Sequence, residues 1–103
     1  MSSRLEQLMG FYEKDPTDVF SLYGIAMEHL GSGDEEQALA WFQKVHAEDP
    51  DHAYAHYHRA RALSNLGRNT EAAEAIQQGL EAARRSGDSH AAEELTALAE
   101  SLR

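Results

Sequence analysis

The sequence repeats itself with a period of 34 residues. Asp15-Pro16 recurs as Asp49-Pro50, and the chain contains no other proline. Three further pairs have the same spacing: Ala26 and Ala60, Gly33 and Gly67, and Ala38 and Ala72. A fixed period of this length is typical of stacked arrays, in which each small unit packs against its neighbours. Such arrays present surfaces to other molecules, so the repeat favours a binding function over catalysis.

Apolar residues at three- and four-residue spacing predict six helices joined by short turns, and no segment alternates as a strand does. The expected bounds of the first, fourth and fifth helices are 3–13, 53–66 and 70–85. Thr17 or Asp18 is expected to cap the second helix and Asp34 the third, because these side chains accept hydrogen bonds from free backbone N–H groups. Gly87 suits a left-handed end to the fifth helix. The predicted fold class is therefore all-α.

The length and composition indicate one small domain. At 103 residues the chain is long enough for a modest core, and it contains no cysteine for disulfides or thiolate metal sites. No apolar run reaches the roughly 18–20 residues that span a membrane. The N-terminus also lacks the basic start and apolar stretch of a secretory signal. We therefore expect a cytoplasmic protein with no membrane partner.

The net charge of −9 is unevenly distributed, with −8 in residues 1–51 and −1 in residues 52–103. An acidic surface repels phosphate backbones, so nucleic acid is not expected as a partner. Arginine outnumbers lysine by seven to two. This bias, together with the acidity, would suit a source with a salt-rich cytoplasm.

The repeated residues resemble the tetratricopeptide repeat, a unit of two antiparallel helices. The first copy matches the family pattern at Leu22, Ile25, Ala26, Ala38, Phe42 and Pro50. Ala26 and Ala38 are expected to let two helices approach closely, with Phe42 filling the space beside them. His29 stands where the family has an aromatic residue.

A second copy follows, with two departures from the family pattern. It matches at Ala60, Leu63, Ala72 and Ile76. His56 and Arg59 stand where the family has apolar residues, and there is no closing proline. The resemblance implies a right-handed α-α superhelix. It divides the single domain, 1–103, into a leading helix at 3–16, a first repeat at 19–52, a second repeat at 53–86 and a C-terminal capping helix at 88–103.

The resemblance also implies a function and a site. In this family, partners usually lie in the concave groove formed by the first helix of each repeat. We therefore expect a non-enzymatic protein-interaction module that binds a peptide segment of a partner. The implied groove residues are Phe20, Tyr23, Met27, Leu30, Tyr54, Tyr57, Arg61, Ser64 and Asn65. The alternative is that the aromatic residues belong to the core, although Leu22 and Ile25 already occupy the core face of their helix.

The groove differs from one well-known use of the family. Some members clamp the C-terminal carboxylate of chaperones with lysine, asparagine and arginine. Tyr23 and Met27 stand where the lysine and asparagine would be, which leaves only Arg61 to contact an anionic group. The expected ligand is therefore an apolar or aromatic peptide segment with one carboxylate contact.

No motif for catalysis or for a cofactor is present. The sequence lacks a Gly-rich phosphate loop, a nucleophile elbow and a paired-carboxylate arrangement. His52, His56 and His58 lie close together, and the spacing of the first two suits zinc ligands on a helix. No cysteine or carboxylate accompanies them at ligand spacing. Surface and half-buried histidines are the expected interpretation, with no metal site and no cofactor.

Two alternative functions remain at this stage. The module is expected to be a monomer, but it can instead be a scaffold that forms a homodimer through its leading helix. That edge would use Leu5, Leu8, Phe11 and Tyr12. The chain can also be an accessory repeat domain of a larger protein.

Four arginines of the second half raise a further pair of interpretations. They are Arg59, Arg61, Arg84 and Arg85. Together they would form a basic patch for an acidic peptide. Alternatively, they are helix-end charges supported by i,i+4 pairs such as Glu81 with Arg85.

Overall fold

The computed structural model describes residues 3–102, and they form six helices with no strand. The helices are α1 Ser3–Lys14, α2 Val19–Gly31, α3 Glu35–Glu48, α4 Ala53–Asn65, α5 Asn69–Ser86 and α6 Ser89–Ser101. The all-α prediction is confirmed, and the expected bounds of α1, α4 and α5 differ from these by no more than one residue at either end. The predicted C-terminal unit extends to Arg103, which lies outside the described residues.

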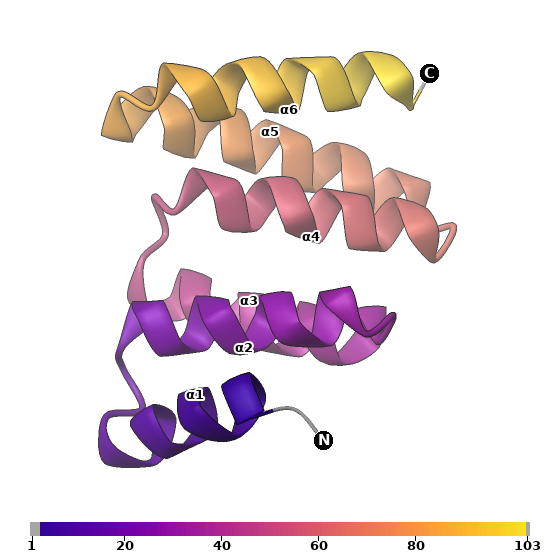
Figure 1. Ribbon diagram of the computed structural model, residues 1–103. Helices are drawn as coiled ribbons and strands as arrows, with labels where there is room; N and C mark the ends of the chain where they lie inside the picture. The colour runs from indigo at the N-terminus through magenta and orange to yellow at the C-terminus, as the bar shows by residue number, and fades with distance from the viewer. Residues whose placement is uncertain (1–2, 103) are drawn as a thin grey trace.

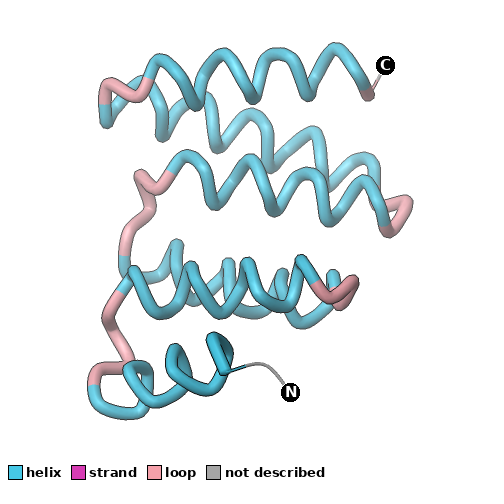
Figure 2. The backbone as a smooth tube through the Cα atoms, in the orientation of Figure 1, coloured by secondary structure: helices cyan, strands magenta, loops and turns pink. Residues whose placement is uncertain are grey.

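The helices stack from α1 at one end of the molecule to α6 at the other. Figure 1 shows α2 in front of α3 and α4 in front of α5, with the two termini at opposite ends of the stack. Figure 2 shows that only short loops join the helices. Each helix packs against its neighbour in sequence, and α4 also contacts α6. As a result, α2 and α4 share one face of the stack, and α3 and α5 share the other.

The turn within each helix pair has the same backbone geometry. Gly33 follows α2 with φ +81°, and Gly67 follows α4 with φ +75°. In both turns the next residue donates its N–H to the carbonyl five residues earlier, with N···O distances of 2.9 Å. This helix end needs a residue with positive φ, which glycine adopts without steric cost. The period seen in the sequence is therefore a repeated turn.

Side-chain caps begin some of the helices as predicted. The Asp34 carboxylate accepts a hydrogen bond from Gln37 N, 3.2 Å away, at the start of α3. The predicted cap of α2 is wrong in detail. Asp18 occupies the N-cap position but accepts from the Ser21 hydroxyl at 2.6 Å instead of from the backbone. Thr17 donates to Asp15, and these hydrogen bonds lower the pKa of the Asp15 carboxyl.

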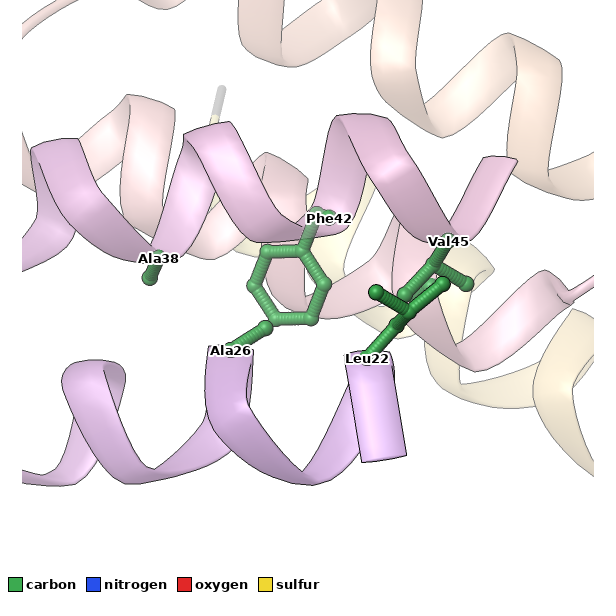
Figure 3. Close-up of a cluster of buried hydrophobic side chains, with 6 residues drawn as sticks. Leu22, Ala26, Ala38, Phe42 and Val45 are labelled. Carbon is green, nitrogen blue, oxygen red and sulfur yellow. The ribbon is translucent and has the colours of Figure 1, made fainter. Parts of the chain in front are cut away.

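Small residues bring the helices of the first pair together. Ala26 of α2 and Ala38 of α3 are completely buried. Figure 3 shows the Phe42 ring reaching from α3 toward Ala26, with Val45 beside Leu22. Since alanine has a single methyl group, the two backbones approach closely and the large ring fills the remaining space.

The second pair uses the same positions 34 residues later. Ala60 and Ala72 are completely buried, and Ile76 takes the place of Phe42. Leu95 of α6 completes this cluster and is also completely buried. The capping helix is therefore part of the second core.

The junction of α3 and α4 is polar, unlike the rest of the core. Leu22 and Ile25 of α2 are buried, but the corresponding residues of α4 are His56 and Arg59. The His56 ring stacks on His46 of α3, with ring centroids 3.6 Å apart and planes 12° apart. Nε2 of His46 donates to the carbonyl of His52 at 3.2 Å. Burial lowers the pKa of both stacked imidazoles to about 4.

The stacked histidines make the stability of the fold depend on pH. The unfolded chain takes up these protons near pH 6.5, whereas the folded protein takes them up only near pH 4. The free energy of unfolding should therefore be largest above pH 6.5 and fall as the pH drops toward 4. Thermal melts at pH 7.0 and pH 5.0, above the range of most carboxyl groups, measure this effect.

The matched variant for this test is His56→Leu, because leucine occupies the corresponding position 22 of the first repeat. Its melting temperature should fall less than that of the wild type between pH 7.0 and pH 5.0. An equal loss in both proteins would show that the stack does not titrate in this range.

Gly79 marks the closest approach of three helices. A Cβ atom built at this position of α5 would lie 2.9 Å from Cβ of His56 and 2.9 Å from Cδ2 of Leu95. Gly79→Ala should therefore destabilise the protein by about 1–3 kcal/mol, the usual range for overpacking. A Cβ atom built at Gly10 of α1 would have no neighbouring atom within 4 Å. Gly10→Ala should stabilise by about 0.5–1 kcal/mol. Urea unfolding of both variants tests this opposite pair of signs.

Candidate partner-binding surface

The predicted groove residues come from the two helices that share one face of the stack. The residues on α2 are Phe20, Tyr23, Met27 and Leu30, and those on α4 are Tyr54, Tyr57, Arg61, Ser64 and Asn65. We call these nine residues the aromatic surface. Figure 1 shows α2 and α4 in the same layer, in front of α3 and α5.

The α2 part of the aromatic surface is divided between core and solvent. Phe20 is 63% exposed, whereas Met27 and Leu30 are partly buried against the first core cluster. Tyr23 is half-buried and stacks on the His52 ring of the next repeat, with centroids 4.6 Å apart and planes 30° apart. Burial raises the pKa of Tyr23, and nearby Tyr54 adds to the shift. Tyr23 therefore joins the two repeats as well as lining the surface.

The α4 part forms a continuous aromatic and cationic strip. The rings of Tyr54 and Tyr57 meet at 76° with centroids 6.3 Å apart. The guanidinium of Arg61 lies 5.8 Å from the centroid of the Tyr57 ring, within the range of a cation–π contact. Ser64 is half-buried and Asn65 is exposed at the end of the helix. Both rings are partly buried against core clusters, whereas Arg61 is exposed. Tyrosine and arginine are among the residue types that contribute most at protein interfaces.

Histidines connect these aromatic residues, and the sequence interpretation did not include them. His58 lies 5.0 Å from Tyr57 and 6.2 Å from Tyr23 between ring centroids. Its Nδ1 is buried without a hydrogen-bond partner, and burial together with Arg61 and His52 lowers its pKa. His90 of α6 shares a hydrogen bond with the Tyr54 hydroxyl. The sequence signal for His58 was its position directly after Tyr57, but the approach of His90 depends on how α6 packs.

The three clustered histidines of the metal hypothesis serve separate contacts. His52 caps α4 by accepting from Ala55 N at 3.2 Å, while His56 stacks on His46 on the side of α3. His58 packs among the aromatic rings. Within residues 3–102 there is no group of three His, Cys, Asp or Glu side chains arranged to hold a metal ion.

The four arginines of the predicted basic patch are not gathered in one place. Arg61 lies over Tyr57, whereas Arg59 is half-buried on the side of α5, where it donates to Gln78. The expected pairing of Arg85 with Glu81 is wrong. Nε of Arg85 lies 2.6 Å from the Asp51 carboxylate, which belongs to the loop before α4. A contact between the repeats replaces the local helical pair.

An acidic cleft borders the aromatic surface. It has a volume of about 490 Å³. Its polar lining includes Asp49, Asp51 and Asp88, together with His52 and Tyr54. The aromatic surface can therefore take apolar or aromatic groups at its rings and a carboxylate at Arg61, while the acidic cleft disfavours further negative charge.

None of the described helices is both long and apolar enough to cross a membrane.

Comparisons with known proteins agree with this architecture. The family model of the tetratricopeptide repeat matches residues 29–98. One similar solved structure is the crystal structure of a tetratricopeptide repeat domain protein from Salinibacter ruber, with 32% sequence identity. The match covers 82% of this chain and 94% of that chain, and the TM-score is 0.77. A solution NMR structure of such a protein from Salinibacter ruber is 32% identical and covers 86% and 90% of the two chains, with a TM-score of 0.78.

No curated protein matches the chain. The family model nevertheless spans more than half of the sequence, and both solved structures share its arrangement of helices over most of their length. This chain belongs to the tetratricopeptide repeat family.

Proposed function

We propose that this protein binds a peptide segment of a partner protein across the aromatic surface of α2 and α4. Tetratricopeptide repeat domains generally mediate protein–protein interactions, and the family is generally not catalytic. The observation that carries the proposal is the 63% exposure of Phe20 on α2, in the layer that also contains α4 with Tyr54, Tyr57 and Arg61. Aromatic residues and arginine are enriched at protein interfaces.

The chemistry of the surface favours one kind of peptide. Phe20, Tyr54 and Tyr57 offer aromatic contacts to an apolar or aromatic side chain. Arg61 offers the one cation of the aromatic surface to a carboxylate. The neighbouring acidic cleft, with Asp49 and Asp88, would repel a strongly acidic segment. The preferred ligand is therefore an apolar segment with a single carboxylate.

Self-association through α1 receives little support from the packing. Of the four side chains expected at that edge, Leu8 is buried and Tyr12 meets Trp41 edge-on, with centroids 4.9 Å apart. Leu5 is half-buried, and Phe11 is 51% exposed. An edge that offers one largely exposed apolar side chain has little surface to bury in a stable dimer.

The test of the peptide site is a double substitution of exposed residues, Phe20→Ala with Arg61→Ala. Tyr23 is a poor target because it is half-buried against His52, so its replacement would also lower stability. Peptides selected from a random library on the wild-type protein should carry an apolar or aromatic residue. Their affinity, measured by fluorescence polarisation, should fall at least tenfold in this variant, with unchanged helicity by circular dichroism.

The matched control is Phe11→Ala with Arg84→Ala, which removes one exposed phenylalanine and one exposed arginine elsewhere. This control should bind the selected peptides as the wild type does. Equal affinity of both variants would contradict the proposed surface. If the control alone lost binding, the site would lie toward α1 or α5.

A further inference from the structure

A second cleft opens between α3 and α5, away from the aromatic surface. It has a volume of about 320 Å³ and includes none of the nine residues of that surface. Gln43 and His46 of α3 form one wall, and Gln78 of α5 belongs to the other. His56 and Arg59 of α4 lie between them. The lining is therefore mostly polar, although it lies at the junction of two repeats.

Arg59 is a half-buried cation that forms no ion pair among the described residues; burial lowers its pKa, and the nearby Glu71 and Glu74 oppose that shift. One of its terminal nitrogens donates to the Gln78 side chain at 2.5 Å and lies 3.5 Å from Nδ1 of His56. Both of these partners are neutral. Its Nε is buried and has no hydrogen-bond partner. Because Nε is closed to solvent, an acceptor from outside the chain can meet only the terminal nitrogens of this guanidinium, which belongs to the cleft lining.

The position of Arg59 in the repeat makes this arrangement unusual. The corresponding residue of the first repeat is Ile25, which is completely buried. In the first repeat, therefore, an apolar residue fills this position. Burying a charge there instead lowers stability unless the charge gains a partner. A ligand for Arg59 would provide that partner.

The charges around the cleft indicate a monoanion. Arg68 donates to Glu71 at 2.8 Å through two nitrogens and to Glu36 at 3.0 Å, so its charge is compensated. The two stacked imidazoles are neutral at pH 7, because burial holds their pKa near about 4. Arg59 is then the one cation of the lining without a bonded carboxylate. A planar carboxylate matches a guanidinium in geometry and in charge, whereas Glu71 on the rim disfavours a phosphate dianion.

We propose that the cleft between α3 and α5 binds a carboxylate group through Arg59. The terminal N–H groups of the guanidinium would donate to the carboxylate oxygens. The carboxylate would belong either to a free small acid or to an acidic side chain of a bound peptide. This site is separate from the peptide site of the aromatic surface, so either one can fail without the other.

The direct test follows the side-chain Nε–H signals of the arginines in the wild-type protein by NMR. Sodium propionate and the peptide acetyl-Gly-Glu-Gly-amide are titrated separately at pH 7 and constant ionic strength, with sodium phosphate as a third arm. The Arg59 signal should shift along a saturable curve with at least one carboxylate, while the signal of Arg84, an exposed arginine outside both proposed sites, should not. The tighter carboxylate identifies the source as a free acid or a peptide side chain.

Three results would overturn the proposal. The first is a shift of Arg59 that grows only linearly with both carboxylates, as expected for a cleft that holds water alone. The second is an equal response of Arg84, which would indicate general screening of charge. The third is saturation by phosphate at a lower concentration than by either carboxylate.

Two variants complete the test. Arg59→Ile should fold, because isoleucine occupies the corresponding position 25, and it should bind the tighter carboxylate at least tenfold more weakly. Arg84→Gln removes an exposed charge that belongs to neither proposed site and should keep the wild-type affinity. Calorimetry measures both. Wild-type affinity in Arg59→Ile, or an equal loss in Arg84→Gln, would contradict the assignment of Arg59.

Discussion

The close approach of helices at small residues is the contact on which this structure depends. Ala26 with Ala38, and Ala60 with Ala72, bring the two helices of each pair together and leave space for one large side chain. Gly79 extends the same principle to α6, since even a methyl group at this position would overlap Cβ of His56. Because close-packed interiors tolerate little change in volume, these small residues fix the spacing of the stack.

The two repeats follow one plan but differ where they meet. Apolar residues cover α2 at Leu22 and Ile25, whereas α4 presents His56 and Arg59 at the same places. The histidine is accommodated by stacking on His46 and stays neutral because it is buried. The arginine keeps a buried Nε without a partner. A polar junction contributes less to stability than an apolar one, and it leaves a cleft on the face opposite the aromatic surface.

Much of the fold could be predicted from the sequence, because its signals are local. The helices, the glycine turns and the cap at Asp34 each depend on residues only a few positions apart, and all are found in the structure. Contacts across repeats were not predicted. Arg85 pairs with Asp51 rather than Glu81, and His90 reaches Tyr54, because helix packing brings residues together that are 34 and 36 positions apart. The nine residues of the aromatic surface remain a prediction for binding experiments.

The sequence by itself determined the helical repeat and the family, because a 34-residue period of small and large apolar residues allows few other folds. It also indicated the small and large residues that pack within each helix pair. Only the tertiary structure decided how exposed each surface residue is. Phe20 lies in solvent while Tyr23, one turn later on the same helix, is half-buried against His52. The cleft around Arg59 likewise depends on the packing of the helices, because its lining residues come from α3, α4 and α5.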